Sequence, residues 1–132
     1  MINNINTGIQ DQGIRLSKEV REFCEEAKAR GEGKNDEYDK PQFKTMAEAW
    51  VYLVLIGAKY PNENVSDWKA HKDPIKWRFI PGDWQKILLL KAFTDMTESS
   101  IDYENLSTIG LRYLENLAVI GVKHEDEHRR KI

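Results

Sequence analysis

The segment between Thr45 and Gly57 constrains the fold most, because a helix wound from it is apolar on almost every side. Its apolar residues are Met46, Ala49, Trp50, Val51, Leu53, Val54, Leu55 and Ile56. Thr45 and Glu48 have the spacing of a capping box, which opens a helix, and Pro61 prevents its continuation. A helix with so little polar surface must be surrounded by other elements. We therefore expect it to be the central helix of the fold.

The residues before this helix predict a short strand followed by an amphipathic helix. Ile14-Arg15-Leu16 alternates as a half-buried strand does, and Ser17 can cap a helix over 18–30. The apolar stripe of that helix has helical spacing and consists of Val20, Phe23, Cys24 and Ala27. This order of elements is that of a ribbon-helix-helix unit, although the loop over 31–42 is longer than the tight turn of that unit.

The second half of the chain predicts another strand and two more helices. Residues 75–80 alternate between Pro74 and Pro81 as an edge strand does. One helix is expected to start at Asp83 as its N-cap and to bury Trp84, Ile87, Leu88, Leu90, Ala92 and Phe93. The other is expected over 102–120, ended by Gly121.

Together these elements predict one mainly α domain over 1–132. We expect a compact bundle of about four helices, a short ribbon-helix-helix-like N-terminal strand and a second short strand near 75–80. Residues 1–12 are expected to form a flexible arm, and residues 123–132 an exposed charged tail. A chain of 132 residues can close a single core without covalent staples.

Charge and cysteine content limit the function classes. Twenty basic against 22 acidic residues give a formal net charge of −2, which counts against a protein that depends on phosphate contacts. The single cysteine, Cys24, fits a reducing cytoplasm. No apolar run approaches the roughly 20 residues of a membrane helix, so no membrane contact is expected.

Basic residues interleaved with aromatic ones provide the candidate nucleic-acid site. Cations can neutralise phosphates while aromatic rings stack on bases. The predicted nucleic-acid-binding residues are Lys69, Lys72, Lys76 and Arg78, beside Trp68, Trp77 and Phe79, with Arg15 of the first strand as a second candidate. The alternative is that Trp77 and Phe79 face the core while Lys76 and Arg78 simply face water.

Catalytic and cofactor sites are not expected. His124-Glu125-Asp126-Glu127-His128 matches the H-E-x-x-H pattern of zinc peptidases, but its intervening residues give it no apolar face for docking against a core. Cys24 lies on an apolar stripe, where an inert buried thiol is expected. The glycines form no phosphate-binding loop. We therefore expect no metal, no cofactor and no enzymatic activity.

The chain resembles a small protein family associated with bacterial DNA phosphorothioation (Dnd) systems. The resemblance rests on short segments: Ile14-Arg15-Leu16-Ser17-Lys18-Glu19, Phe43-Lys44-Thr45-Met46, Ile56-Gly57-Ala58-Lys59-Tyr60, Phe79, Asp83, Tyr113-Leu114-Glu115-Asn116-Leu117-Ala118 and Gly121. It implies an accessory role in DNA modification or in restriction of foreign DNA, with no catalytic residues to carry over.

Three hypotheses about function follow. The first is a non-enzymatic accessory protein of a bacterial or phage DNA-modification or antiviral defence system, acting through a protein partner and DNA contacts. The second is a ribbon-helix-helix regulator, a homodimer in which the N-terminal strands of two chains pair. Pairing of that strand with residues 75–80 of the same chain would make dimerisation unnecessary. The third is a metal-dependent hydrolase using His124 and His128.

Overall fold

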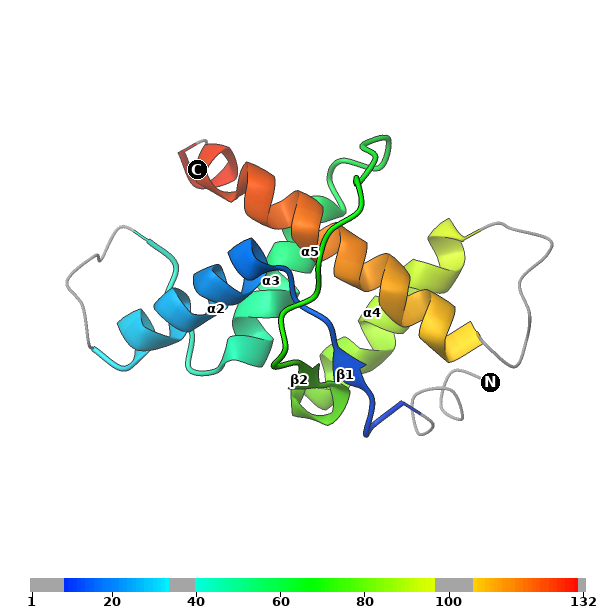
Figure 1. The fold of residues 1–132 in the computed structure, drawn as a ribbon, viewed down its shortest axis with the longest axis horizontal. Helices are drawn as coiled ribbons and strands as arrows, with labels where there is room; N and C mark the ends of the chain where they lie inside the picture. Colours follow the sequence, from blue (N-terminus) through cyan, green and yellow to red (C-terminus); the bar gives the residue numbers. More distant parts are fainter. Residues whose placement is uncertain (1–8, 34–39, 97–105, 131–132) are drawn as a thin grey trace.

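The computed structural model describes residues 9–33, 40–96 and 106–130, and this part of the chain contains four α-helices (Figure 1). The helices are α2 (Lys18–Gly31), α3 (Met46–Gly57), α4 (Gly82–Asp95) and α5 (Leu106–Arg130). The other elements are strands β1 (Gly13–Ile14) and β2 (Ile75–Lys76) and the 3-10 turn η1 (Trp77–Phe79). The expected fold class, a mainly helical domain with two short strands, is confirmed.

Helices α3 and α5 cross at the centre of the molecule (Figure 1), where each brings a glycine against the other's backbone. A Cβ atom at Gly57 would lie 2.7 Å from the carbonyl carbon of Leu117, and one at Gly121 equally close to that of Leu53. Ordinary van der Waals contact begins at 3.4 Å. Only glycine therefore permits this close crossing. The two contacts are reciprocal, because in each helix the leucine that is contacted precedes the glycine by four residues.

The start of α2 and the start of α3 are fixed by the predicted caps. The Ser17 hydroxyl accepts a hydrogen bond from the Val20 amide at 3.2 Å, and the Thr45 hydroxyl accepts one from the Glu48 amide at 3.1 Å. The α3 residues that are buried include Trp50, Leu53 and Val54, whereas Leu55 is 39% exposed. The prediction of a central helix is confirmed, with one side of it open.

The N-terminal strand pairs within its own chain. Strands β1 and β2 are antiparallel, with Gly13 opposite Lys76 and Ile14 opposite Ile75. The predicted arm over 1–12 is wrong for its last residues, because Ile9 is fully buried and its carbonyl accepts a hydrogen bond from the Gln12 amide at 3.0 Å. Residues 1–8 lie outside the described part of the chain.

The strand expected over 75–80 is wrong beyond Lys76. The chain turns into η1, where the Ile80 amide donates to the Trp77 carbonyl at 2.9 Å. Buried Gln85 of α4 holds this turn, because its amide group donates to the carbonyls of Trp77 at 3.3 Å and Ile80 at 2.9 Å. The turn breaks the two-residue alternation. Trp77 and Ile80 point into the core, while Phe79 is 62% exposed.

The N-cap and the buried face of helix α4 differ from those predicted. Pro81 is the residue before the helix, so Asp83 lies in its first turn rather than at the cap. Leu88, Leu89 and Ala92 are buried as core residues, but Ile87 is 51% and Leu90 56% exposed. The buried face of α4 is therefore rotated about the helix axis from the predicted one.

Helix α5 does not end at Gly121. The tail predicted from residue 123 is helical up to Arg130, and one side of it packs on the body: Lys123, Asp126, Glu127 and Arg130 are exposed as predicted, whereas His124, Glu125, His128 and Arg129 are not. The helix continues to Arg130, and Glu125 is only 8% exposed. The His124 ring stacks on that of Tyr60 with centroids 3.9 Å apart, and its Nε2 lies 2.5 Å from Glu63. Ring stacking and ion pairs hold this last part of the helix in place of an aliphatic stripe.

No helix in the described ranges is long and apolar enough to cross a membrane.

Candidate nucleic-acid interface

The segment over 61–74 passes across the outside of α5 on the face seen in Figure 1. It carries Lys69 and Lys72, which are exposed. Two hydrogen bonds fix it to the body: the His71 amide donates to the Leu16 carbonyl at 2.7 Å, and the Arg21 guanidinium donates to the Asp73 carbonyl at 2.5 Å. The lysines are therefore presented from a backbone that is attached to the helical core.

The predicted basic residues divide between two surface hollows. Lys69 and Lys72 line one of about 540 Å³, together with Lys18, Ala70 and His71. Lys76 and Arg78 line the other, of about 520 Å³, whose remaining lining residues are Lys28, Thr45, Met46, Ala47, Pro74, Ile75 and Phe79.

Helix α2 thus adds one lysine to each hollow that sequence reasoning missed. Both side chains have ordinary i, i+4 partners, since Lys18 lies 4.0 Å from Glu22 and Lys28 3.4 Å from Glu32. In the sequence such pairs indicate only a solvated helix face. The side of α2 that faces residues 69–78 is fixed by tertiary packing, so no local signal could have identified these lysines.

Arg15 lines neither hollow and belongs to a different network. Its backbone amide and its Nε donate to the two carboxylate oxygens of Glu115, at 2.6 and 3.0 Å. The Glu115 side chain is fully buried and also pairs with Arg112. The Arg15 guanidinium lies 5.4 Å above the ring of Trp68, whose Nε1 donates to Asn116 at 3.0 Å. Arg15 therefore joins the first strand and the 61–74 segment to α5.

The charged residues that line the hollow around Lys76 are all cations: Lys28, Lys76 and Arg78. Among the described residues, no carboxylate pairs with Lys69, Lys72 or Lys76. Arg78 does have a partner, Asp11, at 3.2 Å. The first turn of α3 also lines the hollow, and a helix N-terminus adds partial positive charge. This surface can therefore bind an anion although the whole chain is slightly acidic.

Phe79 stands at the edge of this hollow with most of its ring in solvent. The guanidinium of Arg78 lies 5.7 Å from the ring centroid, so the cation and the aromatic face are neighbours. The alternative in which Phe79 faces the core is wrong, whereas Trp77 is fully buried as that alternative required. The geometry offers charge and an aromatic face to one ligand.

No family model, curated protein or solved structure matches this chain.

The histidines of the H-E-x-x-H pattern have other partners. His124 contacts Tyr60 and Glu63, while Nδ1 of His128 lies 3.3 Å from the ammonium of Lys59. Hydrogen bonds from Lys123 and His124 lower the pKa of Glu63 below its ordinary value. Within the residues described, no group of three or more histidine, cysteine, aspartate or glutamate side chains is arranged to hold a metal ion.

Cys24 is buried on the inner face of α2, as predicted. Burial raises the pKa of its thiol to about 12, so the reactive thiolate is scarce at neutral pH. This thiol is a packing group.

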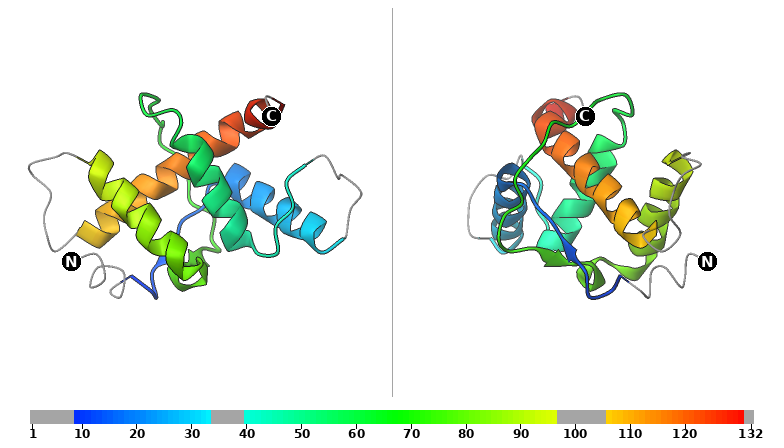
Figure 2. Two further views of the ribbon diagram at one scale, coloured as in Figure 1. Left: turned by 180° about the vertical axis from the view of Figure 1, so that it is seen from behind. Right: turned by 45° about the vertical axis from the view of Figure 1, so that its right-hand side comes forward.

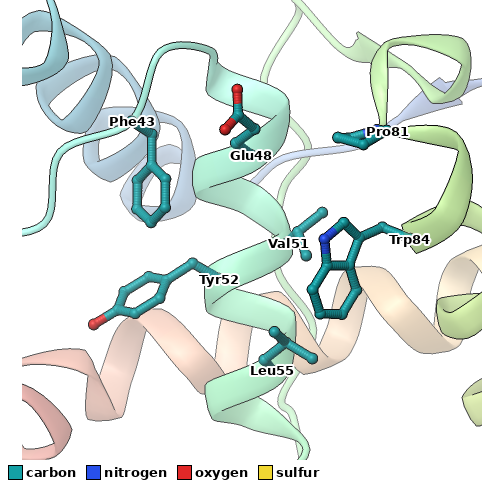
Figure 3. Close-up of a pocket in the computed structure, with 7 residues that line it drawn as sticks. All are labelled: Phe43, Glu48, Val51, Tyr52, Leu55, Pro81 and Trp84. Atoms are coloured by element: carbon teal, nitrogen blue, oxygen red, sulfur yellow. The ribbon is translucent and has the colours of Figure 1, made fainter.

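A second surface, whose lining residues differ from those of the two basic hollows, is apolar. Figure 3 shows the exposed side of α3 as the floor of a groove of about 270 Å³, with aromatic residues on both sides. Its lining residues are Phe43, Glu48, Val51, Tyr52, Leu55, Pro81 and Trp84. Seen from behind in Figure 2, α3 and α4 lie in front, and exposed Ile87 and Leu90 belong to this α4. Exposed apolar surface of this kind commonly marks a protein-binding site.

Proposed function

We propose that this chain is a non-enzymatic accessory protein of a bacterial or phage DNA-modification or restriction system, acting in the cytoplasm through nucleic-acid and protein contacts. The observation that carries the proposal is the row of exposed cations over 69–78, next to an exposed aromatic ring. The resemblance to Dnd-associated proteins supplies the biological setting. In this chain the thiol of Cys24 is buried, and His124 and His128 contact other side chains. These contacts support a binding role rather than a catalytic one.

The apolar groove supports the protein half of the proposal. It has aromatic walls from Phe43 and Tyr52 on one side of α3 and from Trp84 on the other (Figure 3). The basic hollows and this groove have no lining residue in common, so a protein partner and a nucleic acid would contact different side chains. An accessory protein that brings a modification or restriction enzyme to DNA needs this separation.

An electrophoretic mobility series on duplex, nicked and phosphorothioate-modified DNA tests the nucleic-acid half. We expect complexes at low salt that dissociate as salt increases, because counterions compete for the phosphates. Lys72→Glu should weaken binding strongly. Lys86→Glu, the same charge change at an exposed position on α4, should have a much smaller effect. Absence of any complex at low salt would leave protein contacts alone.

The second hypothesis, a ribbon-helix-helix regulator, needs the first strand to pair with its copy in another chain. The pairing of β1 with β2 counts against it, because the hydrogen-bonding groups of β1 already have a partner within the chain. Sedimentation at micromolar concentration separates the two proposals, since a monomer excludes the regulator.

A further inference from the structure

We propose that the hollow beside Phe79 binds single-stranded nucleic acid, with one base stacked on the Phe79 ring and the adjoining phosphates at Lys28 and Lys76. This inference rests on the proposed function and names the form of nucleic acid that this site accepts. It goes further because it assigns a role to an aromatic side chain and to a lysine of α2.

The exposure of Phe79 is the first argument. An aromatic ring gains little by standing 62% in water, and here η1 holds it there while the neighbouring Trp77 and Ile80 fill the core. The turn is fixed from inside by Gln85, so the ring is presented by a rigid support. A rigid aromatic platform beside cations is the usual arrangement for stacking an unpaired base.

The position of the charges is the second argument. Lys28 from α2 and Lys76 from β2 line the same hollow as the ring, so cations from two separate elements converge on it. Arg78 is next to the ring but is paired with Asp11, and Lys28 is paired with Glu32 at 3.4 Å. Lys76 has no carboxylate partner among the described residues, so it is the strongest phosphate ligand of the three. The volume of about 520 Å³ is enough for a nucleotide-sized group.

The lack of a groove-reading element is the third argument. Direct reading of bases in the major groove of duplex DNA typically uses a helix or a two-stranded ribbon. In the described part of the chain, β1 is only two residues long, and Arg15 beside it is held by Glu115. Between Lys18 and Lys28, the exposed residues of α2 are Glu19, Glu22, Glu25 and Glu26, whose carboxylates repel phosphates. A base can reach the Phe79 ring only if it is not paired in a duplex.

Fluorescence anisotropy with labelled 12-nucleotide probes tests the inference on the full-length protein. The probes are oligo-dT, oligo-U and a 12-base-pair duplex at low salt. We expect one or both single strands to bind at least about tenfold more tightly than the duplex, since stacking is worth roughly that factor or more per base. The ratio of the oligo-dT and oligo-U affinities then gives the preference between these two strands, which differ in the sugar and in the methyl group of the base.

Variants of Phe79 identify the binding site. Phe79→Ala should weaken single-strand binding about tenfold, and Phe79→Tyr should restore most of it because the ring is retained. Leu90→Ala is the matched control, because Leu90 is similarly exposed, at 56%, but lies on α4. Lys76→Gln should reduce the slope of log affinity against log salt by about 0.7, the value for one single-strand phosphate contact.

The possible failures can be told apart. Equal or tighter binding of the duplex, or unchanged affinity in Phe79→Ala, overturns the single-strand inference and leaves the proposed DNA contact standing. No binding of any probe at low salt overturns both. Loss of binding in Phe79→Ala counts only if its circular dichroism spectrum and melting temperature match those of the parent. If Phe79→Ala does not fold, Phe79→Tyr still tests the inference, because this variant retains the aromatic ring and should bind single strands nearly as well as the parent.

Discussion

Replacing Gly121 by alanine should strongly destabilise the protein, although alanine is the better helix former. The propensity gain for this change in a helix interior is about 1 kcal/mol. Against it, the new Cβ would lie 2.7 Å from the carbonyl carbon of Leu53 and nearer still to its oxygen, so α3 and α5 must separate by at least about 0.7 Å. No rotamer change can relieve a collision with backbone.

The separation weakens packing along the whole crossing. A gap of 0.5–1 Å already forfeits a quarter to a half of each dispersion contact, and overpacking of a core costs about 1–3 kcal/mol or more. Since the colliding atoms belong to backbone, we take the upper end of that range as the net result. The unfolding free energy of Gly121→Ala should fall by about 3 kcal/mol and the melting temperature by about 10 °C.

Urea unfolding followed by far-ultraviolet circular dichroism measures this loss. Gly82→Ala is the matched control, because a Cβ at this first residue of α4 would meet nothing within 4 Å. It should leave stability unchanged or raise it slightly. Gly57→Ala should behave like Gly121→Ala, and the double variant should lose less than the two single losses together, because the first separation already makes room for the second Cβ. A Gly121→Ala protein as stable as its parent would refute the close crossing.

The remaining predictions concern three titratable or charged groups. Glu115→Gln should lower the unfolding free energy by about 1–3 kcal/mol in urea titrations, because buried Glu115 is the partner of Arg15 and Arg112, whereas Glu22→Gln at an exposed pair should cost less than about 0.5 kcal/mol. Lys123 and His124 lower the pKa of Glu63, so the contribution of its carboxylate to folding stability is complete above the ordinary pKa of 4.5 and is lost as the pH falls below that value. The difference in unfolding free energy between the parent and Glu63→Gln should therefore shrink from pH 6 to pH 3. A constant difference would contradict this ion pair. Cys24 should resist a thiol reagent at pH 8 in the folded protein and react fully in urea, and rapid labelling of the folded chain would contradict its burial.

Local signals in the sequence predicted the starts of α2 and α3 and the central position of α3. Ser17 and Thr45 act through atoms within three residues, so their spacing alone identifies the caps. The apolar circumference of α3 likewise needs no knowledge of its neighbours. The inert character of Cys24 followed from its place on an apolar stripe.

The errors arose where contacts with another element decide the local structure. Residues 77–80 alternate like a strand, but hydrogen bonds from Gln85 turn them into η1 and expose Phe79. The last part of α5 has no aliphatic stripe, and its partners Tyr60 and Glu63 lie about 60 residues earlier. Gly121 looks like a helix end in the sequence, whereas the structure uses it for close contact with α3. Among the candidate site residues, the lysines could be selected by composition, but their division into two hollows depends on α2.

The reciprocal glycine contacts offer a way to recognise distant homologues. Leu53 and Gly57 repeat the spacing of Leu117 and Gly121, and each Cβ-free position accommodates the backbone of the opposite leucine. Substitutions elsewhere in the core can compensate for one another, but no other residue type fits at these two positions. A pair of glycines, one in an apolar helix and one in a later long helix, should therefore survive divergence that erases overall sequence similarity.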